Sequence, residues 1–377
     1  MGGVSMEWKE DVLGNVLEVK YGKDHKKLAD GQYPVYGSGG LMRYVDSKLY
    51  DGPSILIPRK GTLNNIMFVE SPFWTVDTMF WSIINTDKVD SKFLFYSICK
   101  RDFASMNVGS AVPSMTVNIL NDIQISYPKK LEDQRRIASI LSSLDRKIEL
   151  NNKINADLEE MAQAIFKNWF VDFEPFKDGK FVDSELGMIP EGWKVGTLED
   201  IAEITMGQSP AGNSLNENGE GMIFYQGSSD FGFRFPSIRV FTTEPKRLAV
   251  ANSVLFSVRA PVGDINVAKE ECCIGRGVAS IKSKYGHDSY LFYAMKSLHK
   301  LFDSFDGEGT VFGSINKKTL SAIQILLPSD GIVEQFNNVA SSFDDRIRSL
   351  SDENSRLSTL RDTLLPRLMS GELEVPD

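Results

Sequence analysis

The sequence contains one group of residues with the types and spacing of a metal-dependent nuclease centre. Asp230 precedes Glu244-Pro245-Lys246, and such a centre uses spaced carboxylates to hold a metal ion and a lysine near the phosphate. The Glu-x-Lys triplet also occurs at Glu7-Trp8-Lys9 and at Glu18-Val19-Lys20, so it is common in this chain. A stand-alone DNA nuclease or methyltransferase, using Asp230, Glu244 and Lys246 or an unrecognised site, is therefore the alternative interpretation.

Other reaction centres have little support in the sequence. No G-x-x-x-x-G-K-[ST] phosphate loop occurs, and no G-x-G-x-x-G follows a predicted strand. Gly37-Ser38-Gly39-Gly40 is interpreted as a turn, and Glu174-Pro175-Phe176 is only faintly similar to the N/D-P-P-[FY] motif of amino-methyltransferases. Three scattered histidines, and three cysteines without C-x-x-C spacing, do not indicate a metal cluster or a nucleophile–base pair. We therefore expect no metal site and no bound cofactor in this chain.

Polar and basic residues on predicted turns are the remaining candidates for a function. Arg and Lys side chains contact phosphates and guanine edges, and Asn and Gln can read adenine. Each such residue by itself is more typical of a solvated surface, but together they occur at corresponding places in two segments. The candidates for DNA contact are Lys23, Ser38, Arg43, Arg59, Lys60, Gln226, Ser228, Arg234, Arg259, Lys317 and Lys318.

An internal repeat positions these turns. Trp8-Lys9 recurs as Trp193-Lys194, and Ser54-Ile55-Leu56-Ile57 corresponds to Ser253-Val254-Leu255-Phe256. Each copy is expected to form a mixed domain with one helix, near 91–103 in the first and near 289–302 in the second. The strands expected from alternating or continuous apolar runs are 16–19, 54–57, 80–84 and 123–126, then 203–205, 254–258, 278–281 and 323–326.

A long helix is predicted over 132–170, a stretch without Pro or Gly. Apolar or amide residues return in alternating steps of four and three, which is the seam of a coiled coil and requires a partner helix. The seam recurs between Phe336 and Leu368, so the partner lies in the same chain. Residues expected to pair the helices are Leu141, Leu144, Ile148, Asn155 and Leu158, with Phe343, Ile347, Leu350, Asn354 and Leu357.

The order of these elements predicts an α+β fold. Two similar mixed domains are separated by a pair of long antiparallel coiled-coil helices and are related by a pseudo-twofold internal repeat. Antiparallel pairing follows because each helix begins at its own domain and the second domain starts where the first helix ends. The predicted segments are a first domain over 1–130, a long helix over 131–172, a linker over 173–190, a second domain over 191–328, and a helix with tail over 329–377.

Composition and charge favour a soluble protein of the cytoplasm. Hydrophobic residues make up 42% and charged residues 25% of the chain, and no apolar run is long enough to span a membrane. The N-terminus lacks the pattern of a secretory signal, and the cysteine spacing fits a reducing compartment. The net charge is −9, but more than half of it comes from 329–377, so basic surfaces elsewhere are not excluded.

Motifs in the two helices resemble those of the specificity subunits of type I restriction-modification systems. Leu131–Ala138 reads LEDQRRIA, Leu144–Ile148 reads LDRKI, and Asn168–Phe173 reads NWFVDF; all three are similar to that family's central conserved region. The stretch Leu364–Glu372, LLPRLMSGE, is similar to its distal conserved region. The resemblance extends from about Trp8 to Glu374. The two globular segments would then be target-recognition domains, and no base contact can be transferred to them because they diverge within the family.

The resemblance implies a non-catalytic subunit that reads DNA. Each domain would recognise one half of a bipartite asymmetric site, while the paired helices set the spacing and dock methyltransferase subunits, two of which are expected. Restriction endonuclease/translocase subunits would join them, and S-adenosylmethionine, ATP and Mg would belong to these partners. A helix of about 50 Å corresponds to roughly 15 base pairs of DNA. The second alternative is a protein-only coiled-coil scaffold without DNA contact.

Overall fold

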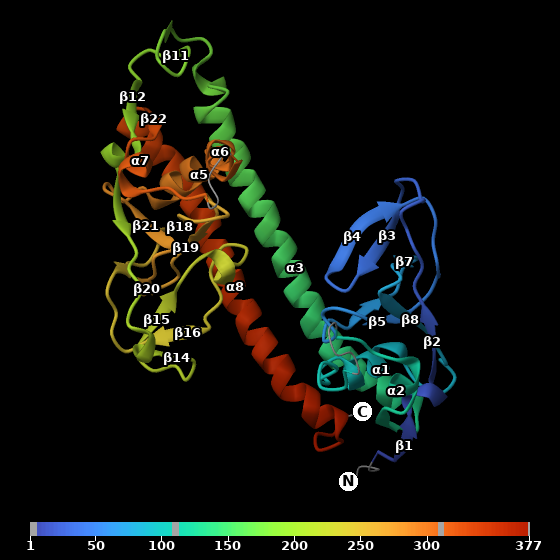
Figure 1. The fold of residues 1–377 in the computed structure, drawn as a ribbon. Helices are drawn as coiled ribbons and strands as arrows, with labels where there is room; N and C mark the ends of the chain where they lie inside the picture. The colour runs from blue at the N-terminus through green and yellow to red at the C-terminus, as the bar shows by residue number, and fades with distance from the viewer. Residues whose placement is uncertain (1–5, 108–112, 308–312, 376–377) are drawn as a thin grey trace. The chain divides into compact units, whose positions relative to one another are not determined.

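The computed structural model describes residues 6–107, 113–307 and 313–375, and it divides into two compact units (Figure 1). The first unit comprises Met1–Asn151 with Ser351–Asp377, and the second comprises Asn152–Leu350. Both boundaries fall inside the long helices α3 (Leu131–Phe170) and α8 (Asp330–Met369). Each unit is therefore one mixed domain together with one half of each long helix.

The first unit is built on an antiparallel sheet of four strands. Every residue of the strand Ser54–Pro58 is buried, as expected for a central strand that is covered on both faces. The helix α1 (Ser91–Ile98) is N-capped by Asp90, whose side chain accepts from the backbone N–H groups of Lys92 and Phe93. The strand order is β2 (Leu17–Tyr21), β8 (Met79–Ile84), β5 (Ser54–Pro58) and β6 (Met67–Val69).

Two smaller sheets complete the first domain. A hairpin carries a parallel third strand, and a two-stranded ladder joins the two ends of the domain just before α3. The short helix α2 (Val117–Asn121) precedes the last strand. The strands are β4 (Gly40–Val45), β3 (Tyr33–Gly37) and β7 (Trp74–Thr75) in the first sheet, and β1 (Trp8–Val12) with β9 (Gln124–Pro128) in the second.

The second unit repeats this arrangement. Its four-stranded sheet is β13 (Ala202–Met206), β21 (Val278–Ser283), β18 (Val254–Ser257) and β19 (Ile265–Val267). Its five-stranded sheet is β14 (Leu215–Asn216), β16 (Val240–Thr242), β15 (Met222–Tyr225), β20 (Cys272–Ile274) and β17 (Leu248–Ala249). The ladder before α8 is β12 (Lys194–Thr197) with β22 (Gln324–Leu327), and the helices are α4 (Leu198–Ile201), α5 (Asp288–Ser297), α6 (His299–Gly307) and α7 (Lys317–Ser321).

Equivalent backbone contacts show that the two domains are copies. Leu13 N donates to Ile123 O at 2.8 Å, and Leu198 N donates to Ile323 O at 2.9 Å. An isolated bridge joins Lys60 to Ser114 in the first domain, and Arg259 to Ser314 in the second. The predicted fold class, two similar α+β domains with paired long helices, is therefore confirmed.

The short edge strands were not predicted from the sequence. β3, β4, β6 and β7 have no counterpart among the predicted strands, and neither have the strands of the five-stranded sheet. The helix predicted near 289–302 is two helices, because α5 ends at the cap Leu298 and α6 follows. The predicted linker contains the 3-10 turn Glu174–Phe176 and a hairpin of β10 (Phe181–Val182) with β11 (Ile189–Pro190). Phe176 lies against Trp193, 5.2 Å between ring centroids, so the Glu174-Pro175-Phe176 motif has a packing role.

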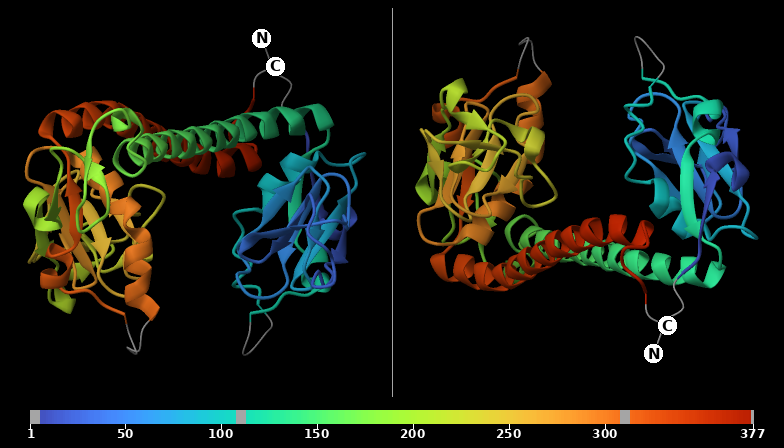
Figure 2. Two further views of the ribbon diagram at one scale, coloured as in Figure 1. Left: turned by 90° about the horizontal axis from the view of Figure 1, so that it is seen from above. Right: turned by 90° about the horizontal axis from the view of Figure 1, so that it is seen from below.

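The long helices α3 and α8 pack antiparallel (Figures 1 and 2). In the first unit, Asn151 Nδ2 donates to Asn354 Oδ1 at 2.9 Å. Toward the start of α3 and the end of α8, Arg361 Nη1 donates to Asp145 Oδ1 at 2.7 Å. In the second unit the ring of Phe166 lies 5.5 Å from that of Phe336. Residue numbers rise along one helix as they fall along the other, which defines antiparallel pairing.

The residues predicted to pair the helices all lie away from open solvent. Leu141, Asn155, Ile347 and Leu350 are buried, and Leu144, Ile148, Leu158, Phe343, Asn354 and Leu357 are half-buried. A hydrogen bond between amides at the seam of the first unit joins Asn151 to Asn354. A buried amide pair of this kind fixes the register of two helices.

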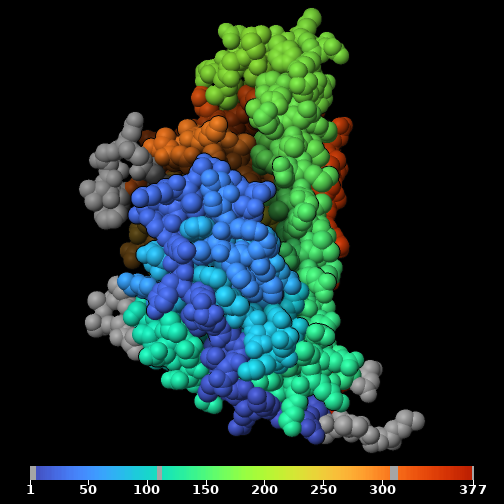
Figure 3. All heavy atoms as spheres, turned by 90° about the vertical axis from the view of Figure 1, so that its right-hand side faces the viewer, coloured from blue at the N-terminus to red at the C-terminus, as the bar shows by residue number. Residues whose placement is uncertain are grey.

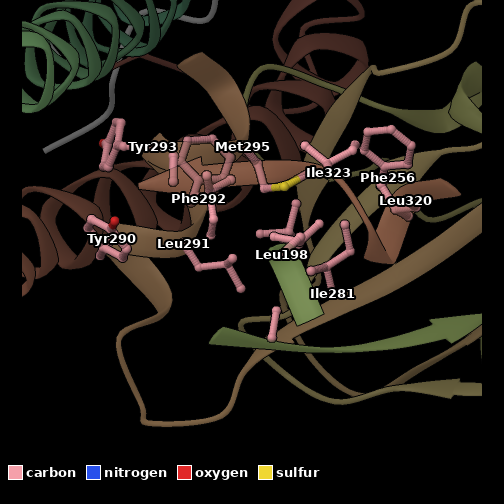
Figure 4. Packing of buried hydrophobic residues seen from close by; sticks show 14 of the residues in the cluster. Leu198, Phe256, Ile281, Tyr290, Leu291, Phe292, Tyr293, Met295, Leu320 and Ile323 are labelled. Atoms are coloured by element: carbon pink, nitrogen blue, oxygen red, sulfur yellow. The ribbon is translucent and has the colours of Figure 1, made fainter. Parts of the chain in front are cut away.

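The core of the second unit includes residues of both long helices. Figure 4 shows part of this core within the domain, with the aromatic rings of Tyr290 and Tyr293 among its members. Phe336 of α8 is fully buried and lies between aromatic rings of α3 and of α5. Its ring centroid is 5.3 Å from that of Phe170, 6.3 Å from Tyr290 and 6.1 Å from Tyr293. This one side chain therefore joins the second domain to both long helices.

Truncation of Phe336 tests this packing. We expect Phe336→Ala to lower the free energy of unfolding by about 3–5 kcal/mol, because it removes a buried aromatic ring and leaves a cavity. Val339→Ala is the control, since Val339 lies on the same helix and is 40% exposed; it should change stability by less than about 0.5 kcal/mol. Denaturant unfolding measures both, and equal effects would contradict the proposed junction.

Candidate nucleic-acid interface

Hydrogen bonds between turns gather four of the candidate residues at one surface of the first domain. Lys23 N donates to Thr75 O at 2.9 Å, which holds the turn after β2 against the end of β7. Arg59 N donates to Thr78 O at 2.8 Å, which brings the turn after β5 to the same segment. We call the resulting surface the first loop surface; it consists of Lys23, Ser38, Arg59 and Lys60.

Ser38 and Arg59 are the more constrained members of the first loop surface. Asn65 Nδ2 donates to Ser38 O at 2.8 Å, and a Cβ built on Gly61 would lie 3.0 Å from Ser38 Oγ. Gly61 also has a φ of +88°, a conformation that only glycine adopts readily. The guanidinium carbon of Arg59 lies 5.6 Å from the ring centroid of Tyr21, an exposed aromatic residue, so the cation is held against a flat apolar surface.

The second domain has an equivalent surface made by equivalent turns. Gly277 N donates to Gln226 O at 3.1 Å, and Val258 N donates to Gly277 O at 3.0 Å. The bridge between Arg259 and Ser314 brings in the segment before α7. We call this the second loop surface; it consists of Gln226, Arg259, Arg276, Lys317 and Lys318, all exposed.

Arg276 is a member of the second loop surface that the sequence reasoning missed. It stands in the turn Gly275-Arg276-Gly277, and its backbone N donates to Ser209 Oγ at 3.3 Å. The same hydroxyl donates to Gln226 Oε1 at 3.0 Å. A Cβ on Gly277 would lie 2.5 Å from Gln226 O, so only glycine permits this close approach. A basic residue between two glycines was the signal that could have identified it.

Three other candidates lie outside the two loop surfaces. Arg43 donates to Leu28 O at 2.7 Å and pairs with Asp30, so its guanidinium supports a neighbouring turn. Ser228 is half-buried at the start of the 3-10 turn Ser228–Asp230. Arg234 is buried, with only 3% of its surface exposed. The structure therefore places Arg234 in the interior of the second unit, and we leave it out of the proposed DNA surface.

The nuclease candidate does not form a metal site among the described residues. Asp230 is buried and accepts a hydrogen bond from Arg239 Nε at 3.0 Å, while Glu244 and Lys246 are exposed. Within 6–107, 113–307 and 313–375, no group of three or more His, Cys, Asp or Glu side chains could hold a metal ion. The carboxylate of Asp230 thus pairs with an arginine of its own loop.

Comparison with known proteins decides the family. The profile of the type I restriction modification DNA specificity domain matches residues 6–160 and 190–357, which is most of the chain. The protein belongs to this family. It is accordingly a DNA specificity subunit of a type I restriction-modification system, and specificity subunits are the non-catalytic part of such enzymes.

Named relatives agree with this assignment. The chain is 34% identical over 300 residues to a Methanocaldococcus jannaschii protein named as the MjaX specificity subunit of a type I restriction enzyme, covering 77% of this chain and 70% of that protein. It is 26% identical over 381 residues to the MjaIX specificity subunit of the same organism, covering 93% and 86%. The crystal structure of a type I S subunit from M. genitalium has the same fold, with a TM-score of 0.64 at 15% identity, covering 100% of this chain and 98% of that one.

No helix among the described segments of the specificity subunit has both the length and the apolar character needed to cross a membrane.

Each domain of the specificity subunit is joined to the long helices through a buried tyrosine and an aspartate. In the first unit, Tyr96 of α1 donates to Asp145 of α3 at 2.5 Å, and Arg361 of α8 donates to the same carboxylate. In the second unit, Tyr293 of α5 donates to Asp344 of α8 at 3.0 Å. Burial raises the pKa of both tyrosines, and in Tyr96 the neighbouring Asp145 raises it further. Both phenols therefore remain protonated donors.

Removal of the arginine from the first junction should weaken that unit. We expect Arg361→Met to lower the free energy of unfolding by about 1–2 kcal/mol, because the Arg361–Asp145 pair is neither fully exposed nor fully buried. Arg356→Met on the same helix is the control, since Arg356 is exposed, and its effect should stay below about 0.5 kcal/mol. Thermal and denaturant unfolding would measure the difference; an Arg361 variant as stable as the wild type would contradict a structural role for the pair.

Proposed function

We propose that each mixed domain reads one half of a bipartite asymmetric DNA site through its loop surface. The observation that carries this proposal is the recurrence of basic and polar residues on equivalent turns of two copies. Lys60 bridges to Ser114 and Arg259 bridges to Ser314, so a cation stands at the same place in both domains. The residues around them differ between the copies, which favours two different half-sites.

The paired helices support a second part of the proposal, that the distance between the half-sites is set by α3 and α8. Each helix contains 40 residues, which corresponds to about 60 Å at the α-helical rise per residue. A continuous helix pair with a fixed register resists compression, because shifting it by one step would take apolar residues out of the seam. A fixed nonspecific gap between two short recognised halves follows from this.

Partner subunits complete the proposed assembly. Apolar side chains remain exposed on the outer faces of the long helices: Leu150 and Met161 on α3, and Val339 and Leu360 on α8. Figure 3 shows one face of α3 uncovered. We propose that two methyltransferase subunits dock on these faces and that restriction endonuclease/translocase subunits join them. The S-adenosylmethionine, ATP and Mg chemistry would reside in those partners, in the cytoplasm.

Methylation mapping tests the half-site proposal. We expect a host that carries this chain with its neighbouring subunits to methylate one bipartite asymmetric motif, which is absent without the chain. Arg59→Ala with Lys60→Ala should weaken binding to the first half-site, and Arg259→Ala should weaken binding to the second. In both cases methylation should fall first at motifs whose affected half-site is bound weakly. Each phosphate contact removed should also flatten the salt dependence of DNA binding by about one unit of logarithmic slope.

Two further assays separate the alternatives. Cleavage or methylation of DNA by the purified chain alone, abolished by Asp230→Ala, would favour a stand-alone enzyme. Unchanged DNA binding by the assembled complex after Arg59→Glu, Arg259→Glu and Lys317→Glu would favour a protein-only scaffold. A motif that is symmetric or has a single half would contradict the two-domain reading.

Shortening both helices tests the spacing proposal. Deletion of residues 147–153 and 352–358 removes one heptad from each helix and takes out the Asn151–Asn354 pair as a unit. We expect the gap in the methylated motif to shorten by about 10 Å, or roughly 3 base pairs, because the helical rise sets the separation. Circular dichroism confirms that the double deletion is folded and helical. A folded protein that recognises an unchanged gap would refute a spacing role for the helices.

A further inference from the structure

Arg234 makes three hydrogen bonds to three different helices of the second unit. Its Nε donates to Glu159 Oε2 of α3 at 3.0 Å, and its Nη1 donates to Asp344 Oδ1 of α8 at 2.7 Å. Its Nη2 donates to Tyr293 OH of α5 at 2.9 Å. Arg234 itself belongs to none of these helices, because it lies in the irregular segment 226–239 between β15 and β16. We call this segment the tethered loop.

The charges around Arg234 are balanced and its guanidinium is enclosed. Lys296 of α5 also pairs with Glu159, so two cations face two carboxylates. The guanidinium carbon lies 4.0 Å from the ring centroid of Phe292, which covers one face of the cation. Burial lowers the pKa of Lys296, although its side chain is still 36% exposed. A buried ion pair in which each guanidinium nitrogen has a hydrogen-bond partner is specific in geometry, because a displacement separates the charges.

The backbone beside Arg234 is tied down as well. Val267 N of β19 donates to Arg234 O at 2.9 Å. Asn266, which is buried, donates from its side chain to Gly232 O at 2.9 Å and accepts from Gly232 N at 3.0 Å. Arg348 of α8 lies 4.9 Å above the ring of Phe235. The tethered loop is thus fixed at residues 232–235 between the second domain and α8.

The tether connects directly to the second loop surface. The tethered loop begins at Gln226, a member of that surface, and continues through Ser228. Ser237 N donates to Asp230 O at 2.8 Å, and Arg239 pairs with the Asp230 carboxylate, so the loop is closed on itself. Beneath it lies a polar cavity of about 180 Å³ lined by Arg234, Phe235, Asp344 and Arg348 among others. Arg234 and Phe235 of the loop thus line this cavity together with residues of α5 and α8.

In the described part of the first unit, the arginine at the equivalent junction comes from a long helix and not from a loop. Asp145 corresponds to Asp344 in the repeat, but the arginine that meets Asp145 is Arg361, which belongs to α8. At the position of α3 that corresponds to Arg361 stands Ala162, which is fully buried and too short to reach a carboxylate. Arg234 supplies the missing cation from the loop instead. Arg361 in the first unit joins one long helix to the other, whereas Arg234 in the second unit joins a loop to the long helices.

We propose that Arg234 is a positioning residue that anchors the tethered loop to both long helices and thereby sets the geometry at which the second half-site is read. This inference rests on the proposed function. It assigns a specificity role to a buried residue that does not touch DNA, and it restricts that role to one of the two half-sites. Recognition of the first half-site is independent of the anchor.

The test compares three variants in the complete complex with its neighbouring subunits. Arg234→Ala removes the anchor, and Arg234→Lys keeps the charge but not the three-way hydrogen bonding. The third variant combines Arg234→Ala with Ala162→Arg, which places the cation on α3 as Arg361 places it on α8. This double variant is designed to restore a partner for Asp344, and with it stability, without restoring the connection to the loop.

Methylation of DNA with single mismatches in either half-site is the readout. For Arg234→Ala and for the double variant, we expect discrimination against mismatches in the second half-site to fall about tenfold. The reason is that a misplaced loop no longer makes the base contacts whose loss penalises a wrong base pair. Discrimination in the first half-site should remain at the wild-type level. Arg234→Lys should lie between wild type and Arg234→Ala, and the melting temperature of the double variant should exceed that of Arg234→Ala.

The outcomes distinguish the inference from the function on which it rests. A wild-type complex that methylates no bipartite site refutes the proposed function itself. A wild-type complex that does so, with folded Arg234 variants that discriminate normally in the second half-site, overturns the anchor alone. Equal losses in both half-sites, or recovery of discrimination together with stability in the double variant, would show a merely structural role and also overturn it. If Arg234→Ala does not fold, the lysine and double variants decide by the same criteria.

Discussion

The narrow apolar stripe of a long helix is the constraint on which the rest of this structure depends. Such a stripe cannot be buried by the helix that carries it, so α3 and α8 have to pair. Along the chain, the first domain precedes α3 and the second domain follows α3 and precedes α8. Each compact unit consequently contains one domain and half of each helix. The Asn151–Asn354 pair specifies the register further, because a shift of one helix along the other would break the hydrogen bond between these amides.

Charged groups at the domain–helix junctions fix how each domain attaches to the helix pair. A charged group removed from water must meet a partner, and that partner has to stand at hydrogen-bonding distance. Asp145 and Asp344 satisfy this requirement with a tyrosine of the adjoining domain and an arginine. The two units solve the same problem with arginines from different elements, so a duplicated fold has acquired two different junctions. Divergence at the junction thus accompanies divergence of the loop surfaces.

Much of the fold and part of the site could be predicted from the chain. The seam of α3, the repeat of Trp8-Lys9 at Trp193-Lys194 and the apolar central strands are local patterns, and they correspond to observed elements. Basic residues such as Arg59 and Arg259 could be assigned to equivalent turns for the same reason. Arg276 was missed because a single basic residue in a glycine turn is a weak signal. The edge strands were missed because short runs carry little periodicity.

What the sequence by itself determined is the pair of long helices, the duplicated α+β domains and the family, because these follow from periodicity and from motifs read within short windows. Only the tertiary structure decided which arginines face solvent. Arg234 and Arg239 stand five residues apart in one loop, yet the first is buried against Glu159 and Asp344 and the second is exposed. Burial depends on contacts between residues from distant parts of the chain, and a local sequence pattern does not contain this information.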